Sequence, residues 1–301
     1  MIFDRRATTA VATTLFLWAS AFVAIRIALT GFGAPGLSLG RLLVASAALA
    51  AVAPLFKVRM PARSDFLRIA ACGLSGMTAY QLLLNAGERT VPAGTASMLV
   101  NTGPIFAALL AFLLLREKLG PRGVLGIVLG FVGALIITFT QGGGFQPSVD
   151  ALLVLGAAVS QALFFVLQKP LLARYQGIEV TCYATWTGTL FSLPMLPWLI
   201  SDLPAADGST IAALVFLGVG PSAIGFATWA YAQSRAPVAT VANTLFLVPF
   251  LAIGIGWVAL QETIHPLAVL GGLIAIGGVA VSRSTGKSKK PAQASEPSTS
   301  R

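Results

Sequence analysis

Polar side chains recur at helical spacing inside the long apolar stretches of this 301-residue sequence. One run has intervals of three, four and three residues, which place its members on a single helix face: Thr78, Gln81, Asn85 and Glu88. Such groups are costly in apolar surroundings, so we expect them to face a cavity or a neighbouring helix. The chemistry they suit is non-covalent recognition, because amides and hydroxyls donate and accept hydrogen bonds.

Other apolar stretches carry further hydroxyls and amides, which have two interpretations. They could form ordinary hydrogen bonds between helices, each typically worth ~0.6 kcal/mol, and this explains the Ser and Thr residues best. Amides are harder to satisfy when buried, because each has donors as well as an acceptor. We therefore favour a cavity-lining role for Gln81, Asn101, Gln161 and Asn243.

Aromatic side chains are a second class of candidate. Trp18 lies near the middle of the first apolar stretch, beside Ser20 and Phe22. An aromatic face can stack on a ligand ring or receive an ammonium group, although plain packing explains any single aromatic equally well. The complete set of predicted binding residues is Trp18, Ser20, Thr78, Gln81, Asn101, Gln161, Phe164, Trp186, Trp229 and Asn243.

Charged residues inside or beside the apolar stretches leave several roles open. Arg26 and Arg41 could extend to the outer interface, pair with Glu88, or bind a ligand carboxylate. Glu117 and Glu262 directly follow apolar stretches, so we interpret them as structural residues at span ends. A proton-relay role for this pair is the weaker alternative.

Membrane-spanning helices must position these groups. Hydrophobic residues make up 56% of the sequence and charged residues 10%, against roughly 25% charged in soluble proteins. Apolar runs of about 20 residues, enough to cross a bilayer, separate short charged clusters. The net charge of +10 is spread between these runs, which argues against a nucleic-acid partner. Cys72 and Cys182 lack metal-ligand spacing and are expected in the core.

Ten spans fit the sequence and predict an all-α integral membrane fold. We place them at 8–30, 37–56, 66–87, 92–115, 121–140, 150–172, 180–200, 209–232, 237–260 and 265–282. With the N-terminus in the cytoplasm, 17 Lys and Arg residues lie on the inner side, while the outer loops hold only Arg89. The first stretch lacks a clear cleavage site and is expected to be retained as a span. Residues 283–301 are expected to form a disordered cytoplasmic tail.

One helical unit occurs twice in the chain. At an offset of 145 residues, the matched pairs include Pro92 with Pro237, Pro104 with Pro249, Glu117 with Glu262, and Gly133 with Gly278. We predict a first repeat at 8–140, a linker at 141–149 and a second repeat at 150–282. Because five spans is an odd number, the repeats are inverted, as in many secondary transporters. Pro104 and Pro249 are expected to bend their spans as hinges, and glycines on the fifth span of each repeat predict close helix packing.

Several motifs carry a family resemblance. They are Trp-Ala-Ser-Ala-Phe at 18–22, Arg41-Leu-Leu, Arg116-Glu117-Lys118-Leu119, and the second-half segments Ala236-Pro237-Val238 and Gln261-Glu262-Thr263. Over about residues 8–282 the sequence resembles EamA-type members of the drug/metabolite transporter superfamily, particularly the amino-acid exporters. The resemblance implies a ten-span carrier of the inner membrane. Spans 1 and 6 align poorly, with Trp18 opposite Ser160 or Gln161, so the halves should contribute unequally to a central site.

The expected function is export of neutral amino acids, including aromatic ones, or of similar small metabolites by alternating access. The cavity should be lined mainly by spans 1, 3, 4, 6, 8 and 9, without a buried counter-charge. A small-molecule substrate and the lipid bilayer are the expected partners, with no cofactor or metal. The protein is expected in the bacterial cytoplasmic membrane with both termini in the cytoplasm, as a monomer or an oligomer of unknown size.

The energy source and two rival functions follow from groups that the sequence lacks. It contains no G-x-x-x-x-G-K-[ST] loop, its single histidine lies at a span end, and no Asp or Glu lies deep in a predicted span. Downhill movement or exchange is therefore favoured. A proton-coupled exporter of drugs or other metabolites would need a buried carboxylate, for which Glu88 is the candidate. A membrane-embedded enzyme would need a convergent catalytic set, and none is visible.

Overall fold

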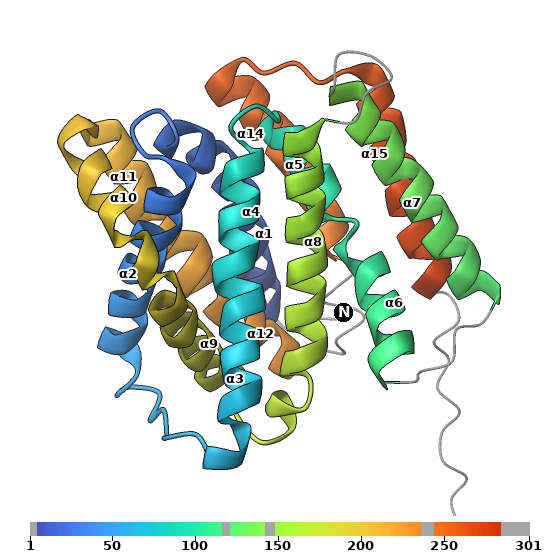
Figure 1. Cartoon of the computed structure of the whole chain (residues 1–301). Coiled ribbons are helices and arrows are strands. Elements are labelled where there is room, and N and C mark those ends of the chain that lie inside the picture. The colour runs from blue at the N-terminus through green and yellow to red at the C-terminus, as the bar shows by residue number, and fades with distance from the viewer. Residues whose placement is uncertain (1–4, 116–120, 142–147, 236–243, 284–301) are drawn as a thin grey trace, which may run out of the picture.

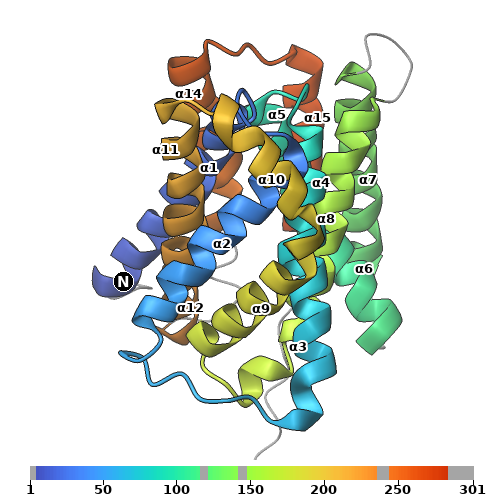
Figure 2. The same cartoon turned by 60° about the vertical axis from the view of Figure 1, so that its left-hand side comes forward.

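The computed structural model describes residues 5–115, 121–141, 148–235 and 244–283, and every regular element in those ranges is helical. The first half contains α1 (Arg5–Ala28), α2 (Ala34–Val52), η1 (Arg63–Asp65), α3 (Phe66–Cys72), η2 (Gly73–Ala79), α4 (Tyr80–Gly87), α5 (Ala93–Val100), α6 (Gly103–Leu115) and α7 (Pro121–Gln141). The second half contains α8 (Val149–Gln168), η3 (Leu171–Ala173), α9 (Gly177–Ser192), η4 (Leu193–Met195), α10 (Leu196–Asp202), η5 (Leu203–Ala205), α11 (Gly208–Leu217), η6 (Gly218–Gly225), α12 (Phe226–Arg235), η7 (Thr244–Leu247), α14 (Val248–Leu260) and α15 (Pro266–Arg283). Figures 1 and 2 show these helices gathered into one bundle.

The helices have the length and composition of membrane spans. Five stretches are long and apolar enough to cross a bilayer, at Arg5–Ala28, Ala34–Val52, Arg63–Gly87, Val149–Ala173 and Gly208–Trp229. Shorter apolar helices cover Pro121–Ile137, Val248–Leu260 and Pro266–Gly278. Large apolar side chains such as Leu67, Leu190 and Val258 point outward, where lipid would cover them. The chain is therefore an all-α integral membrane protein, and its helices are consistent with ten spans.

In two predicted spans, the mid-span proline lies in the first turn of an α-helix. The fourth span was expected to be one helix bent at Pro104, but α5 ends at Val100 and α6 begins at Gly103, so Pro104 is the second residue of a new helix. In the ninth span, Pro249 is likewise the second residue of α14. Proline lacks the N–H group that a helix interior requires, whereas the first turn of a helix tolerates its absence.

Both halves contain a π-helical segment at the same place in the repeat. The segment η2 continues α3 into α4, and η6 continues α11 into α12. The first residues of the two segments, Gly73 and Gly218, are separated by the repeat offset of 145 residues. π-Helical turns are rare and are frequent at functional sites. The duplication has therefore preserved a backbone irregularity in the middle of two spans.

Contacts between the halves follow the same offset. At one end of the bundle, the backbone N–H of Gly33 donates to the Asp202 carboxylate at 2.9 Å. At the other end, Arg59 pairs with Glu179 at 3.1 Å. Adding the offset of 145 to Gly33 gives residue 178, which is next to Glu179. Subtracting it from Asp202 gives residue 57, which is two residues from Arg59. This correspondence supports an inverted relation between the halves.

The fifth spans of the two halves, α7 and α15, pack against each other directly, as the green and red helices of Figure 1 show. A Cβ atom added to Gly278 would lie 2.6 Å from the carbonyl oxygen of Gly126, and one added to Gly271 would lie 2.8 Å from that of Gly133. The predicted close packing of these glycines is thus confirmed, because only hydrogen fits between the backbones.

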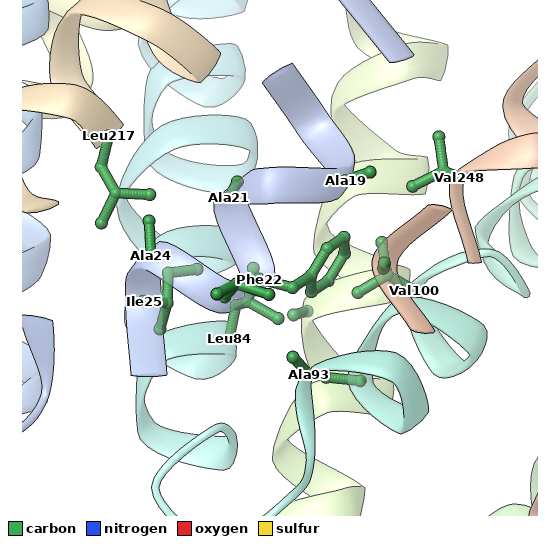
Figure 3. Packing of buried hydrophobic residues seen from close by; sticks show 14 of the residues in the cluster. Ala19, Ala21, Phe22, Ala24, Ile25, Leu84, Ala93, Val100, Leu217 and Val248 are labelled. Carbon is green, nitrogen blue, oxygen red and sulfur yellow. The ribbon is translucent and has the colours of Figure 1, made fainter. Parts of the chain in front are cut away.

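The main hydrophobic cluster lies around α1. Figure 3 shows Phe22 of α1 directed toward Val100 at the end of α5, with Val248 of α14 nearby and Leu217 of α11 on the opposite side of α1. Phe22, Val100 and Val248 are buried, so α1 is held from both halves of the chain. This helix supplies the largest share of the central cavity described next.

Candidate functional site

A cavity lies at the centre of the bundle. The space that can hold the centre of a water-sized sphere is about 70 Å³, within an empty volume of about 710 Å³ that includes open solvent. Its walls come from spans 1, 2, 3, 4, 6, 8 and 9. They are formed by Trp18, Ala21, Phe22, Ile25, Arg41, Tyr80, Leu84, Val100, Asn101, Gln161, Phe165, Pro221, Phe226, Leu245 and Val248.

Trp18 is held in one orientation on the cavity wall. Its indole Nε1 donates to the carbonyl oxygen of Pro221 in η6 at 3.2 Å, and its ring lies 5.2 Å from those of Phe226 and Trp229. A Cβ atom on Gly225 would lie 2.7 Å from Nε1, so this glycine provides the space that the indole occupies. The π-helical segment η6 therefore positions the aromatic residue.

Two amides reach the cavity from opposite halves. Asn101 lies at the break between α5 and α6, and its side-chain nitrogen donates to the Ser97 carbonyl at 2.9 Å. That bond leaves the amide oxygen of Asn101 available as an acceptor. Gln161 comes from the middle of α8. Together with the Tyr80 hydroxyl they give a mostly apolar cavity a few fixed polar groups.

Arg41 brings a buried positive charge to the same wall. The residue is 4% exposed, and its Nε donates to the Ser222 hydroxyl of η6 at 3.0 Å. Its Nη1 has no hydrogen-bond partner in the part of the chain that the structure describes. Of the roles that the sequence left open for Arg41, the position in the cavity wall argues against extension to the outer interface and leaves binding of a ligand carboxylate open. Composition alone could not distinguish a buried arginine near a span end from an interfacial one.

Glu88 is buried next to the cavity rather than in its wall. It is 0% exposed, and neither carboxylate oxygen has a hydrogen-bond partner among the described residues. Glu88 directly follows α4, so it lies at the end of a span and not deep within one, although its side chain is buried. The predicted third span ended at residue 87, one position short of this side chain.

Arg26 closes the end of the bundle that the sequence places outside. Its Nε pairs with the Glu262 carboxylate at 2.9 Å, and its Nη1 donates to the carbonyl oxygens of Glu88 and Arg89 at 2.6 and 2.8 Å. The second oxygen of Glu262 accepts from the Ala93 backbone N–H at 2.8 Å. Glu262 is thus a structural residue at a span end, as interpreted, and it joins the two halves. Glu117, its repeat counterpart, lies outside the described residues.

Comparison with known proteins identifies the family. The EamA-like transporter family matches residues 6–139 and again residues 149–284, so it matches most of the chain in two copies. The chain belongs to the EamA-like transporter family. The protein is therefore a multi-pass membrane transporter and not an enzyme.

Several relatives share the family and the length. A protein of Streptantibioticus cattleyicolor named "Probable terminal-alkyne amino-acid exporter" is 46% identical over 91% of this chain and 92% of its own. An uncharacterized transporter of Bacillus subtilis is 37% identical over 87% of this chain and 86% of its own. A solved crystal structure has a TM-score of 0.63 at 20% identity, covering 94% of this chain and 99% of that one, which bears on the fold alone.

Among the predicted binding residues of this EamA transporter, three line the cavity together: Trp18, Asn101 and Gln161. Two others bind neighbouring helices instead. Thr78 donates to the Gly188 carbonyl at 2.9 Å and accepts from Ser192, and Trp186 donates to the Ser46 carbonyl at 3.3 Å.

The remaining predicted residues lie behind the wall or within one helix. Ser20 donates to the Phe16 carbonyl of its own helix at 2.8 Å. Phe164 packs on Gly76, and Trp229 supports Trp18 from behind. Gln81 is 1% exposed, and its Oε1 has no partner among the described residues. Asn243 lies outside the described residues.

The sequence analysis missed the aromatic and apolar half of the wall. Pro221, Phe226, Leu245 and Val248 line the cavity, and none stands out in a chain that is 56% hydrophobic. The one available signal was Pro221, a proline inside an apolar run. Its carbonyl oxygen accepts the hydrogen bond that holds Trp18 on the cavity wall.

Proposed function

We propose that this EamA transporter exports neutral amino acids with apolar side chains, aromatic ones included, by alternating access through the central cavity. The observation that carries the proposal is the cavity wall, which combines aromatic and aliphatic surface with Trp18, Asn101, Gln161 and Arg41. Such a wall suits a ligand with one apolar end and one end rich in hydrogen-bonding groups. The relative named an amino-acid exporter, at 46% identity, supports the same class of substrate.

The transport step rests on closing one end of the cavity at a time. The Arg26–Glu262 pair accounts for closure at the outer end in this conformation. Opening that end requires the pair to separate, with the helix starts at Pro104 and Pro249 serving as hinges. Substituting either proline with alanine should then change flux more than binding, because the hinges lie next to the cavity wall without forming it.

The membrane location follows from the distribution of basic residues. We infer a bacterial cytoplasmic membrane with both termini on the cytoplasmic side, because 17 of the 20 Lys and Arg residues fall on the predicted inner side. The two repeats, at residues 8–140 and 150–282, are the inverted units whose relation provides the two alternative states.

Flux measured in proteoliposomes tests the substrate class. Purified protein is reconstituted with labelled phenylalanine, leucine or propargylglycine inside, and release is followed with and without a pH gradient. Release of at least one of these amino acids without a gradient is the expected result. If none of the three moves while the protein remains folded, the substrate class is wrong. Flux that requires the gradient would overturn downhill movement.

Glu88 favours a second candidate, a proton-coupled exporter. A buried carboxyl whose two oxygens have no partner among the described residues is satisfied better when it carries a proton. Arg26, Arg41, Glu262 and Tyr80 are the charged and titratable groups near it. If coupling uses Glu88, E88Q should lose the stimulation of flux by a pH gradient while keeping exchange of labelled for unlabelled substrate. Equal stimulation in E88Q and the parent protein would exclude this role.

A further inference from the structure

Arg41 is the one charged side chain among the described residues that line the cavity. It makes no ion pair with any described residue, although it is 4% exposed. Burying a cation without an anionic partner is unfavourable, because the charge gives up its hydration without a matching attraction. Glu88 is close enough to influence it electrostatically, but no carboxylate oxygen comes within the 4.0 Å of an ion pair.

The guanidinium is held in position while part of it remains unsatisfied. Ser222 accepts from Nε and fixes one edge of the group, whereas Nη1 is buried with no partner among the described residues. The backbone beneath it is also fixed, because a Cβ atom on Gly218 of η6 would lie 2.9 Å from the Arg41 carbonyl oxygen. Arg41 is therefore a preorganised donor, and only part of its hydrogen-bonding capacity is used by the protein.

The geometry points to Arg41 as the group that binds the α-carboxylate of the transported amino acid. This inference rests on the proposed function and assigns a position to each part of the substrate. A guanidinium matches a carboxylate with two parallel hydrogen bonds, which are stronger than bonds between neutral groups. The amide oxygen of Asn101, which accepts no hydrogen bond from the described residues, can accept from the ammonium group, and Trp18, Phe165 and Phe226 cover the apolar side chain.

Two ligands that differ only at the carboxylate test the inference. Binding of phenylalanine and of phenylalaninamide is measured by titration calorimetry on the detergent-purified protein and on R41Q, R41K and S222A. The control R122Q removes one positive charge from an exposed residue of α7, a helix that does not line the cavity. We expect the parent protein to prefer phenylalanine, and R41Q to bind it about 10- to 100-fold more weakly.

The affinity for phenylalaninamide distinguishes a loss of carboxylate recognition from damage to the structure of the protein. R41Q should bind phenylalaninamide no more weakly than the parent protein does, because the amide loses nothing when the guanidinium is removed and escapes repulsion of its own positive charge. R41K should retain part of the preference for phenylalanine over phenylalaninamide. In S222A this preference should fall several-fold, and in R122Q it should equal that of the parent protein. Loss of both ligands together would indicate structural damage and would contradict the assignment.

Other outcomes separate this inference from the proposed function. If the parent protein binds and moves phenylalanine but folded R41Q keeps the full preference over the amide, the carboxylate assignment is wrong and the substrate class stands. If R41Q does not fold, R41K and S222A decide, and an unchanged preference in both overturns the assignment. If the parent protein neither binds nor moves the amino acids tested, the proposed function fails and the assignment fails with it.

Discussion

The two π-helical segments, η2 and η6, occupy equivalent positions in the repeats and have different contacts. In η2, Met77 lies against Gly188 of α9, and Thr78 donates to the carbonyl of the same glycine. In η6, the carbonyl of Pro221 accepts from Trp18, and the Ser222 hydroxyl accepts from Arg41. Gly76 and Met77 are the repeat counterparts of Pro221 and Ser222.

This difference teaches that the duplication kept the backbone and changed the chemistry. A π-helical turn disturbs the regular hydrogen bonding of its helix and so makes backbone groups available. In the first half, helix α9 packs against the irregular segment. In the second half, Trp18 and Arg41, which line the cavity, form hydrogen bonds to the irregular segment. The anchors of the site therefore come from one π-helical segment, which agrees with the unequal alignment of spans 1 and 6.

The strongest test of the packing role of η2 is Gly73→Ala. A Cβ atom at residue 73 would lie 2.7 Å from the Gly188 nitrogen and 2.9 Å from the Ala184 carbonyl oxygen, which are both backbone atoms. Helix α9 would have to move, at a cost of about 1–3 kcal/mol or more. We expect a large fall in thermal stability and in the yield of monodisperse protein. Parent-like stability would show that η2 and α9 are less closely packed than described.

A change at the other end of η6, Gly225→Ala, should affect transport instead. The added methyl group would lie 2.7 Å from Trp18 Nε1, and the indole is a side chain that can move aside. Displacing it would break the bond to Pro221 and alter the cavity wall, so we expect flux to fall about tenfold, equivalent to about 1.4 kcal/mol. Melting temperature should change little. A large loss of stability with normal flux per folded molecule would reverse the roles assigned to the two segments.

A smaller effect is expected from Thr78→Val. The substitution keeps the shape of the side chain but removes its hydrogen bonds to Gly188 and Ser192. Such contacts between membrane helices are worth ~0.6 kcal/mol on average, so stability should drop slightly. Substrate affinity should stay unchanged, because Thr78 does not line the cavity. Weaker binding measured by calorimetry would return Thr78 to the binding site predicted from the sequence.

The smallest effect concerns the helices that lead into the two segments. Asp207 caps α11 and accepts from the Thr210 backbone N–H at 2.8 Å, whereas its repeat counterpart, Ala62, has no side-chain cap. This hydrogen bond, with help from the Ser209 hydroxyl, holds the pKa of the Asp207 carboxyl below its usual value. A lowered pKa means that the stabilisation is present above the unfolded pKa, about 3.9, and is lost as the pH falls. Asp207→Ala should lower the melting temperature slightly at pH 7 and not at pH 3; equal effects at both would contradict this.

Much of the fold could be predicted from the sequence, because hydrophobic runs, charged joints and the 145-residue repeat are properties of the chain itself. The site could be predicted only in part. Trp18, Asn101 and Gln161 stood out because polar or amphipathic groups in the middle of a span are costly. Phe226 and Val248 could not be distinguished, since an apolar side chain in a membrane protein can face lipid, core or cavity alike.

Thr78 shows a second limit of the sequence. A regular period of 3.6 residues put it on the face of Gln81 and Asn85, but η2 extends to Ala79 and has i→i+5 hydrogen bonds. The wider turn rotates everything before it relative to α4, so Thr78 faces α9. No pattern of residue types revealed this change of helical period.

The seam between α7 and α15 limits how the transporter can change shape. Glycine hydrogens there face carbonyl oxygens of the opposite helix, as Gly278 does with Gly126, with no side chain between them to switch rotamer. Sliding or rolling at the seam would drive one backbone into the other. Helices α7 and α15 must then move as a single rigid unit. The relative motion that admits or releases substrate has to occur between the helices on opposite sides of the cavity, where longer side chains can change their contacts.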